Sequence, residues 1–502
     1  MWKTEPRTGG ANSGTVTKFA RAFPFSEDVC REFGDRPRIS SPRPWLSPVS
    51  AIALVLACIV LAAQQPPPPN LLVIDHVAIF DGTGNPVLKN GVIVIEGDRI
   101  RDIGIRGNIK GGPGITILDA KGKFAIPGLI DAHVHFDQSA DIFARPDAVD
   151  LRGVRSYVDE IAWTKRRLPE TLMRYLRAGI TGVVDMGGPM WTLDFRDSAN
   201  QMANSPRVAA AGPLISTEAD PQLESSDSPV ILIETPDDAL QIVRKIAEHK
   251  PDLIKILFIH HIGQDLDRQA ALVQIAIAES HRLGIRVAAH ATELDTAKAV
   301  LGAGADILVH SVEDRRVDSE FLSMLKARDI IYIPTLMVTE GYDEVFGRAV
   351  KLSAIEKRLG DPEVIQSWTE LDRIPANRIP GGIPEATLLE SRPTQFLNLQ
   401  ILTSANVRIA AGTDAGNIGT LHGPALHREM ELMEQAGMRP FDILLAATRN
   451  AADVMGKSSE LGTLAKGRLA DIVLLDGDPV RDIRNTQKIF KVIKAGKVVE
   501  LP

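Results

Sequence analysis

The middle of the chain alternates between short apolar runs and amphipathic stretches, and this alternation restricts the fold more than any other feature. Several runs end in Gly or a polar residue, which is typical of parallel strands covered on both faces. The expected strands are Ala125–His133, Ile180–Asp185, Arg207–Ala211, Leu253–Phe258, Arg286–Ala291, Asp306–His310, Ile330–Pro334 and Arg408–Asp414. Amphipathic stretches such as Asp237–His249 and Asp267–Leu283 separate them as helices. These β/α units predict an α/β protein with a (β/α)8 TIM barrel over residues 125–440.

Short runs rich in Val and Ile also flank the barrel region on both sides. They are separated by Asp-Gly, Asn-Gly and Gly-Asp turns, a pattern that favours strands. We therefore expect a small β-sandwich domain built from both ends, with its first part at 71–124 and its second part, after a last helix, within 441–502. A doubly wound parallel sheet is the alternative fold, but no Gly-rich phosphate loop follows a first strand.

Residues 1–63 have the features of a signal peptide or N-terminal extension. Ala51–Ala63 is an uncharged apolar run, shorter than the ~20 residues that span a bilayer but within the ~7–15 of a secretory signal. A Pro-rich spacer follows at 64–70. This pattern predicts a periplasmic or secreted protein. An uncleaved membrane anchor is the alternative, and lipidation of Cys58 is a weaker one.

The charge balance limits the partners of this chain. It has 57 Lys+Arg against 64 Asp+Glu, a net charge of −7, and no basic block, so a nucleic-acid surface is not expected. Its two cysteines cannot form a disulfide scaffold or a four-thiolate zinc site. A small-molecule substrate is the expected partner, and a homo-oligomer is compatible with the sequence.

Chemically active side chains fall at the carboxyl ends of the expected strands, where the active sites of such barrels lie. Alternation along a strand puts His133 and His135 on the same side. A lone His at a strand end is usually structural, and an Asp after Gly-Thr usually caps a helix. A Lys between Ile and Leu in a buried strand is costly unless it is paired or modified. The occurrence of all these side chains at the ends of expected strands favours a metal site. Its ligands would be His133, His135, Lys255, His290, His310 and Asp414.

These residues lie in motifs that resemble the amidohydrolase superfamily. The similar segments are Pro127–His135, Lys255, His290, His310 and Gly412-Thr413-Asp414, with Val94–Ile100, Gly462–Leu464 and Gly467–Val473 on the flanks. Within the superfamily the chain is most similar to the imidazolonepropionase-like and Xaa-Pro dipeptidase-like branch. The resemblance implies a distorted barrel with a small β-sandwich and one or two divalent metals, usually zinc.

The resemblance also implies a role for each ligand. His133, His135 and Asp414 would hold the buried metal, His290 and His310 the second one, and a carboxylated Lys255 would bridge both. Two cations would activate a water to hydroxide, and Asp414 would serve as the catalytic acid and base. Relatives of the imidazolonepropionase type lack the lysine of the fourth strand and use one metal, so Lys255 favours two.

The leading hypothesis is a secreted, metal-dependent amidohydrolase that cleaves an amide C–N bond through a metal-activated hydroxide. The substrate could be a dipeptide, an N-acyl amino acid or a cyclic amide. One alternative is a mononuclear imidazolonepropionase-like ring-opening hydrolase or deaminase, and another is a non-catalytic binding or assembly protein of the same fold. The candidate substrate-binding residues are His260, His261, Tyr332 and His422.

Overall fold

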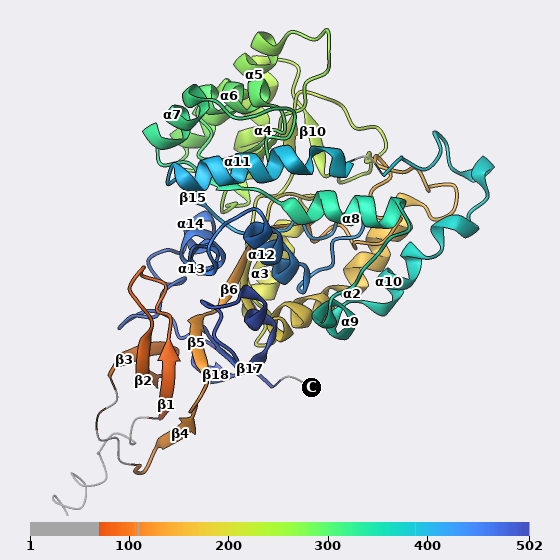
Figure 1. The fold of residues 1–502 in the computed structure, drawn as a ribbon. Coiled ribbons are helices and arrows are strands. Elements are labelled where there is room, and N and C mark those ends of the chain that lie inside the picture. Colours follow the sequence, from red (N-terminus) through yellow and green to blue (C-terminus); the bar gives the residue numbers. More distant parts are fainter. Residues whose placement is uncertain (1–69, 106, 108–110, 387, 501–502) are drawn as a thin grey trace, which may run out of the picture. The chain divides into compact units, whose positions relative to one another are not determined.

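A computed structural model describes residues 70–105, 107, 111–386 and 388–500 (Figure 1). Residues 68–502 form one compact unit. The expected signal peptide at 1–63 and residues 64–69 of the expected spacer at 64–70 lie outside the described residues. Within the described part of the chain, no helix combines the length and the apolar character needed to cross a membrane.

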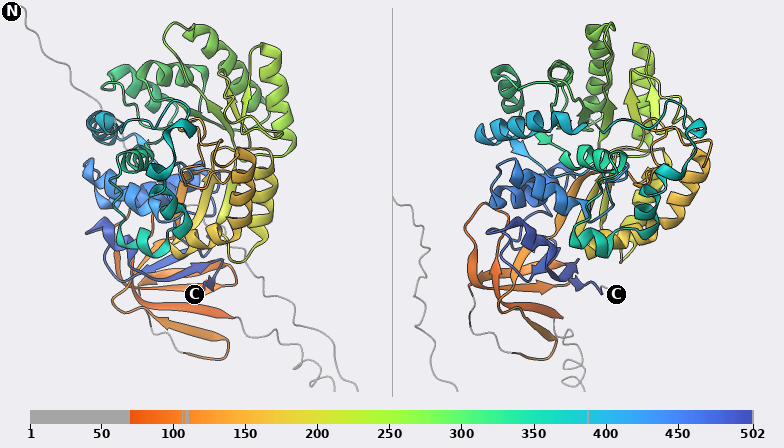
Figure 2. Two further views of the ribbon diagram at one scale, coloured as in Figure 1. Left: turned by 90° about the vertical axis from the view of Figure 1, so that its right-hand side faces the viewer. Right: turned by 45° about the vertical axis from the view of Figure 1, so that its right-hand side comes forward.

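One mixed sheet contains the first and the last described strands, in the order β18-β17-β16-β5-β1-β2-β3, with β4 paired to β1. In both views of Figure 2 the red-orange and dark blue strands lie together at one end of this unit. Alternate residues such as Ile74, Ile93 and Leu474 pack into one core cluster. The strands are β1 Leu71–Ile79, β2 Leu88–Glu96, β3 Arg99–Ile105, β4 Ile115–Asp119, β5 Phe124–Pro127, β16 Ile472–Leu475, β17 Ile489–Lys494 and β18 Lys497–Val498.

The parallel strands form two further sheets. One has the order β6-β7-β8, and the other has the order β10-β9-β11-β12-β13-β14-β15. Their bounds are β6 Leu129–Val134, β7 Ile180–Asp185, β8 Arg207–Ala210, β9 Leu214–Ser216, β10 Val230–Leu232, β11 Ile254–Leu257, β12 Val287–His290, β13 Ile307–Val309, β14 Ile331–Ile333 and β15 Arg408–Ile409.

Backbone hydrogen bonds connect the two sheets from both edges of the three-stranded sheet. The amide of Ala132 in β6 donates to Ala411 O (2.9 Å), and the amide of His135 donates to Ala415 O (2.8 Å), so β6 lies beside the segment after β15. At the opposite edge the amide of Asp252, just before β11, donates to Ala210 O of β8 (3.0 Å). The carboxyl ends of β6 and β15 therefore lie next to each other.

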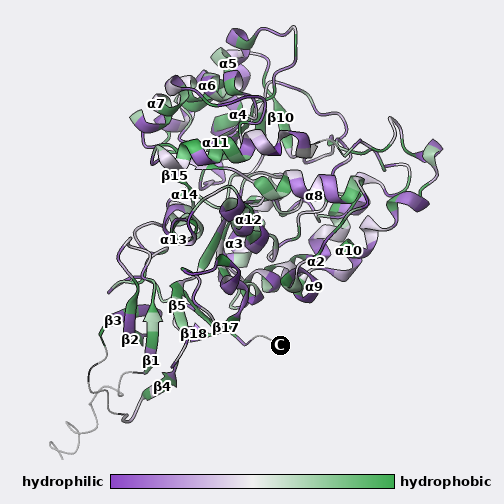
Figure 3. Ribbon diagram, in the orientation of Figure 1, coloured by the Kyte–Doolittle hydropathy of each residue, from purple (hydrophilic) through white to green (hydrophobic). Residues whose placement is uncertain are grey.

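Helices follow most of the parallel strands and pack against them. Ile254 and Ile256 of β11 share a core cluster with Val273 and Ala276 of α5, while Leu253 belongs to a second cluster on the other side of the strands. In Figure 3 helices such as α5, α7 and α11 carry both hydrophobic and hydrophilic residues. The α-helices are α2 Tyr157–Arg177, α3 Trp191–Gln201, α4 Pro236–Glu248, α5 Leu266–Arg282, α6 Leu294–Ala303, α7 Ser319–Ala327, α8 Leu336–Phe346, α9 Ala354–Leu359, α10 Pro362–Trp368, α11 Arg392–Ser404, α12 Ala425–Gln435, α13 Pro440–Leu445 and α14 Ala451–Val454.

Two of the expected strands differ from the structure. The run Ala125–His133 is not one strand, because it is divided at Gly128 into β5 of the mixed sheet and β6 of the parallel sheet. A Cβ at Gly128 would lie 2.0 Å from Thr181 Oγ1, so only glycine fits where the chain passes from one sheet to the other. The run Arg408–Asp414 forms a ladder only at Arg408–Ile409, since the amides of Thr413 and Asp414 donate to His133 O instead.

Candidate metal centre

His133 in β6, His135 directly after β6 and one aspartate from the segment after β15 meet at the adjacent strand ends. The Nε2 atoms of His133 and His135 are 3.2 Å apart. Asp414 Oδ1 lies 3.3 Å from His133 Nε2 and 2.9 Å from His135 Nε2. All three residues are buried. The Asp414 backbone has a positive φ of 62°, a turn that follows the hydrogen bond from its amide to His133 O.

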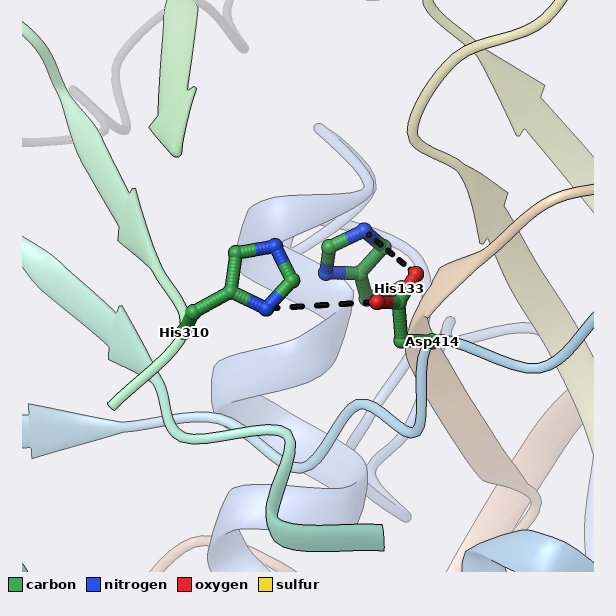
Figure 4. Close-up of side chains that lie close together, drawn as sticks. All are labelled: His133, His310 and Asp414. Atoms are coloured by element: carbon green, nitrogen blue, oxygen red, sulfur yellow. Dashed lines mark ion pairs between the residues drawn. The ribbon is translucent and has the colours of Figure 1, made fainter. Parts of the chain in front are cut away.

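His310 completes a group of possible ligands. Its Nδ1 is 3.9 Å from Asp414 Oδ2, and one ligand atom each from His133, His310 and Asp414 can be chosen so that all lie within 4.8 Å of one another. Figure 4 shows the two imidazole rings and the carboxylate turned towards one another. The ring of His290, at the end of β12, lies with its centroid 4.4 Å from that of His310.

Lys255 is the remaining predicted ligand, and it is almost completely buried in β11. Its neighbours Ile254 and Ile256 face the helices, so alternation turns Lys255 to the other side of the strand. Lys255 pairs in register with Ala288, two residues before His290. Burial lowers the pKa of this amine to about 8, opposed by the negative charge of Asp414. The six predicted ligands are thus gathered at one end of the parallel strands.

The electrostatics of this centre suit a divalent cation. Burial holds the pKa of His133 and of His290 well below the usual range and lowers that of His310 to about 3, so these imidazoles are neutral at pH 7. Burial raises the pKa of Asp414, but the surrounding imidazoles, with a hydrogen bond from His135 among their contacts, outweigh it and hold that pKa well below the usual range. Neutral imidazoles and a carboxylate are the donors that zinc prefers.

Comparison with known proteins agrees with this arrangement. Residues 124–499 match the amidohydrolase family. This chain belongs to that family. The amidohydrolase is 25% identical over 427 residues to an imidazolonepropionase of Rubrobacter xylanophilus, which covers 80% of this chain and 89% of the relative. It is 24% identical over 411 residues to a 5-methylthioadenosine/S-adenosylhomocysteine deaminase of Moorella thermoacetica, covering 78% and 82% of the two chains.

Solved structures show the same fold. A Xaa-Pro dipeptidase with bound methionine superimposes with a TM-score of 0.65 at 23% identity, covering 86% of this chain and all of the other. A prolidase-like protein from Bifidobacterium longum gives 0.63 at 23% identity and covers 86% and 95%. The chain is therefore a hydrolase acting on C–N bonds, and its family implies a divalent metal.

Two residues that the sequence patterns did not indicate hold the predicted ligands in place. His135 Nδ1 donates to the carbonyl of Gly187 (2.6 Å), which turns Nε2 towards Asp414. Asp131 accepts hydrogen bonds from Thr413 Oγ1 (2.7 Å) and the Thr413 amide (3.0 Å). Asp131 therefore ties the strand of His133 to the segment of Asp414. Asp131 could have been noticed in the sequence, because it is a charged residue inside an apolar strand. The carbonyl of Gly187 leaves no trace in the sequence.

Thr335 is a third such residue, because its Oγ1 lies 2.8 Å from Nδ1 of His310. Thr335 precedes α8 with φ 45° and ψ 51°, a left-handed conformation that is rare for a β-branched residue. Its hydroxyl makes no cap hydrogen bond to α8, the usual role of Thr at that position. The strained backbone places the hydroxyl on the imidazole ring instead.

We expect Thr335→Val to lower the affinity of the centre for zinc about 10- to 100-fold, the usual effect of removing a hydrogen bond to a metal-binding His. Valine keeps the branched shape and loses only the hydroxyl. Thr335→Ser keeps the hydroxyl and should retain wild-type affinity. Equilibrium dialysis against a zinc chelator measures this, with Thr339→Val on the same helix as the control. Wild-type affinity in Thr335→Val would contradict the role.

The structure gives two of the candidate substrate-binding residues other roles. Tyr332 shares the helix-facing cluster, while its neighbours Ile331 and Ile333 belong to the other cluster, so its side chain points away from the metal centre. Its hydroxyl accepts the hydrogen bond of the Val312 amide (2.8 Å). This corrects the expectation that Tyr332 faces the substrate. Neighbouring side chains of a strand point to opposite faces of the sheet, so a shift of one position turns a side chain away from the site.

The expectation that His422 binds substrate is corrected for a different reason. Both of its ring nitrogens form hydrogen bonds to other residues of the protein. Nδ1 lies 2.8 Å from the Tyr175 hydroxyl and Nε2 lies 2.8 Å from Gln138 O. The ring stacks on Phe136 at an interplanar angle of 9°. His422 therefore supports the loop after β6. His260 and His261 follow β11, where His260 Nδ1 lies 2.8 Å from Gln269 Oε1 and His261 is exposed, and a contact of either with substrate stays a prediction.

Proposed function

We propose that this amidohydrolase cleaves an amide C–N bond in a dipeptide, an N-acyl amino acid or a cyclic amide. The observation that carries the proposal is the convergence of His133, His135, His310 and Asp414 at adjoining strand ends. The two parallel sheets, connected through β6 and the segment after β15 and through β8 and β11, support a (β/α)8 barrel as the scaffold. The mixed sheet would be its β-sandwich domain.

The same residues support a centre for two divalent metals, zinc being the expected one. His133, His135 and Asp414 would hold one ion, and His290 and His310 the second. The buried amine of Lys255, whose pKa is about 8, is available in neutral form to attack carbon dioxide. A new N–C bond forms and one proton is released, so the lysine becomes an anion with two oxygens that can bridge the ions.

Asp414 is the acid and base in this proposal. Metal ions bound at the centre would polarise the scissile carbonyl and acidify a water molecule. Asp414 takes a proton from the attacking water and delivers it to the leaving nitrogen as the C–N bond breaks. Its carboxylate is suited to this role, because the hydrogen bond from His135 helps to keep it ionised although it is buried.

The second candidate is a mononuclear ring-opening hydrolase or deaminase, and the names of the curated relatives favour it. Metal analysis of the purified protein separates the two. About two ions per chain support the binuclear enzyme, and about one ion per chain supports the alternative. Screening the metal-loaded enzyme against dipeptides, N-acyl amino acids and lactams then identifies the bond that is cleaved, and a protein that binds no metal contradicts both.

We also propose that the enzyme is exported, with residues 1–63 removed. The apolar run Ala51–Ala63 and the Pro-rich spacer support this location. In a Gram-negative host we expect the mature protein in the periplasm with an N-terminus near Gln64, as determined by N-terminal sequencing. An intact cytoplasmic chain beginning at Met1 would contradict export.

A further inference from the structure

The loop between β6 and α2 carries two Arg–Asp pairs of similar geometry. Arg145 donates from Nε and Nη2 to the Asp147 carboxylate (2.8 and 2.5 Å). Arg152 donates from Nε and Nη2 to the Asp150 carboxylate (2.8 and 2.7 Å). In each pair the Arg and the Asp are two positions apart in the sequence. The two pairs therefore differ in their surroundings and not in their own geometry.

Only the first of these pairs is connected to the metal centre by the hydrogen bonds of the described residues. Arg145 Nη1 donates to Asn417 Oδ1, which also accepts the Tyr342 hydroxyl (2.9 Å). Asn417 Nδ2 in turn donates to the backbone oxygen of Asp414 (3.0 Å). Two successive hydrogen bonds, both made by Asn417, thus connect the Arg145 guanidinium to the backbone of Asp414, the predicted acid and base. The Arg152 side chain is more exposed than that of Arg145, 40% against 25%, and it bonds to Asp150.

The charge of Arg145 also reaches the predicted ligands. Burial is the main cause of the low pKa values of His290 and His310, and the charges of other site residues come next. The positive charge of Arg145 makes a smaller contribution in the same direction. The negative charge of Asp414, with larger contributions from Asp147 and Tyr342, helps to raise the pKa of Arg145 against its burial. Arg145 therefore remains a cation within electrostatic range of the predicted ligands.

Arg145 keeps hydrogen-bonding capacity for a ligand. A guanidinium has five N–H donors, and the bonds to Asp147 and Asn417 occupy one on each nitrogen, which leaves two. Because these bonds already fix the side chain, little further conformational entropy is lost when it binds a ligand. The planar arrangement of its donors matches a carboxylate.

We propose that Arg145 binds a carboxylate group of the substrate next to the scissile amide, so that the enzyme acts on N-acyl amino acids or dipeptides and not on neutral amides. This rests on the proposed function and specifies its substrate class. Asp147 and Asn417 orient the guanidinium, and Asn417 sets its distance from Asp414.

The test uses substrate pairs that differ only in the carboxylate. A panel of N-acetyl-L-amino acids, each with the N-acetyl amine that lacks the carboxylate, is assayed with the metal-loaded full-length enzyme. We expect the wild type to hydrolyse the acids and to leave the amines nearly untouched, and Arg145→Met to raise KM for the acids about 10- to 100-fold, the effect of losing a charged hydrogen bond. Arg152→Met is the matched control and should alter neither series. Isothermal titration of chelator-treated protein with the best acid should show the same loss of binding in Arg145→Met.

Arg145→Met leaves Asp147 without its partner and could destabilise the loop, so Arg145→Met/Asp147→Leu is tested as well, which removes both charges. The double variant should show the same increase in KM for the acids. Equal KM values for acids in the wild type and both variants would overturn the role of Arg145. Equal turnover of acids and amines by the wild type would overturn the substrate class. Absence of hydrolysis in both series by the metal-loaded wild type would instead contradict the proposed function.

Discussion

Replacing Asp414 with Asn is expected to lower kcat about 10²- to 10⁴-fold, the contribution that a positioned acid or base makes to a reaction. The amide has nearly the same shape, but it cannot take a proton and is a weaker metal ligand. Asp414 touches His133 and His135, so its loss affects the centre and leaves the buried strands beneath it intact.

The readouts are kcat with the best substrate, bound metal, and far-UV circular dichroism to show that the fold remains. Asp329→Asn is the control, because the Asp329 side chain is exposed and pairs with Arg408 and not with a predicted ligand. Wild-type kcat in Asp414→Asn would remove Asp414 from the mechanism.

Replacing Lys255 with Met is expected to lower kcat/KM about 10²- to 10³-fold, comparable to removing one strong electrostatic contact from an active site. Methionine fills the space in β11 but cannot become a bridging anion. Short carboxylic acids such as acetate should restore part of the activity, because they can occupy the space of the lost group. Lys298→Met is the control, since Lys298 lies on α6 and forms ion pairs with Asp318 and Glu320 at the start of α7. Wild-type turnover and metal content in Lys255→Met would favour the mononuclear alternative.

The same substitution should stabilise the metal-free protein. A pKa lowered from 10.5 to about 8 means that the folded state holds the proton of Lys255 less strongly than the unfolded state. Below pH 8 the buried charge therefore costs stability, on the order of 3 kcal/mol, and this cost disappears as the pH rises from about 8 to 10.5. In chelator-treated protein, Lys255→Met should have a higher Tm at pH 7, and the difference should shrink towards pH 10. A lower Tm at pH 7 would contradict this.

The parallel strands were predictable because burial on both faces leaves a direct trace in the sequence. Ile180–Asp185 is predicted with the bounds of β7, and the runs that become β11, β12 and β13 differ from the structure by one residue at each end or less. The strands β9 and β10 were not predicted, since three residues are too few to show a period. The division at Gly128 depends on a contact with Thr181, which lies in another strand and has no local signal.

The site was predictable to a similar depth. The ligand candidates could be proposed from the sequence, because their residue types and their positions at strand ends both restrict the choice. The supporting contacts could not, since the strained conformation of Thr335 and the carbonyl of Gly187 are set by the packing of distant segments. The errors for Tyr332 and His422 have the same origin, because the face of a strand and the partners of a buried ring depend on tertiary structure.

The position of β5 has a consequence for the biosynthesis of this protein. β5 continues through Gly128 into β6, which carries His133, and its outer edge is paired with β16 near the end of the chain. During translation β5 can pair with β1, which precedes it, but it waits for almost the whole polypeptide before its second neighbour, β16, exists. Such a long-range pairing slows folding. A nascent or C-terminally truncated chain would expose this edge, so premature termination should yield an aggregation-prone product and not a partly active enzyme.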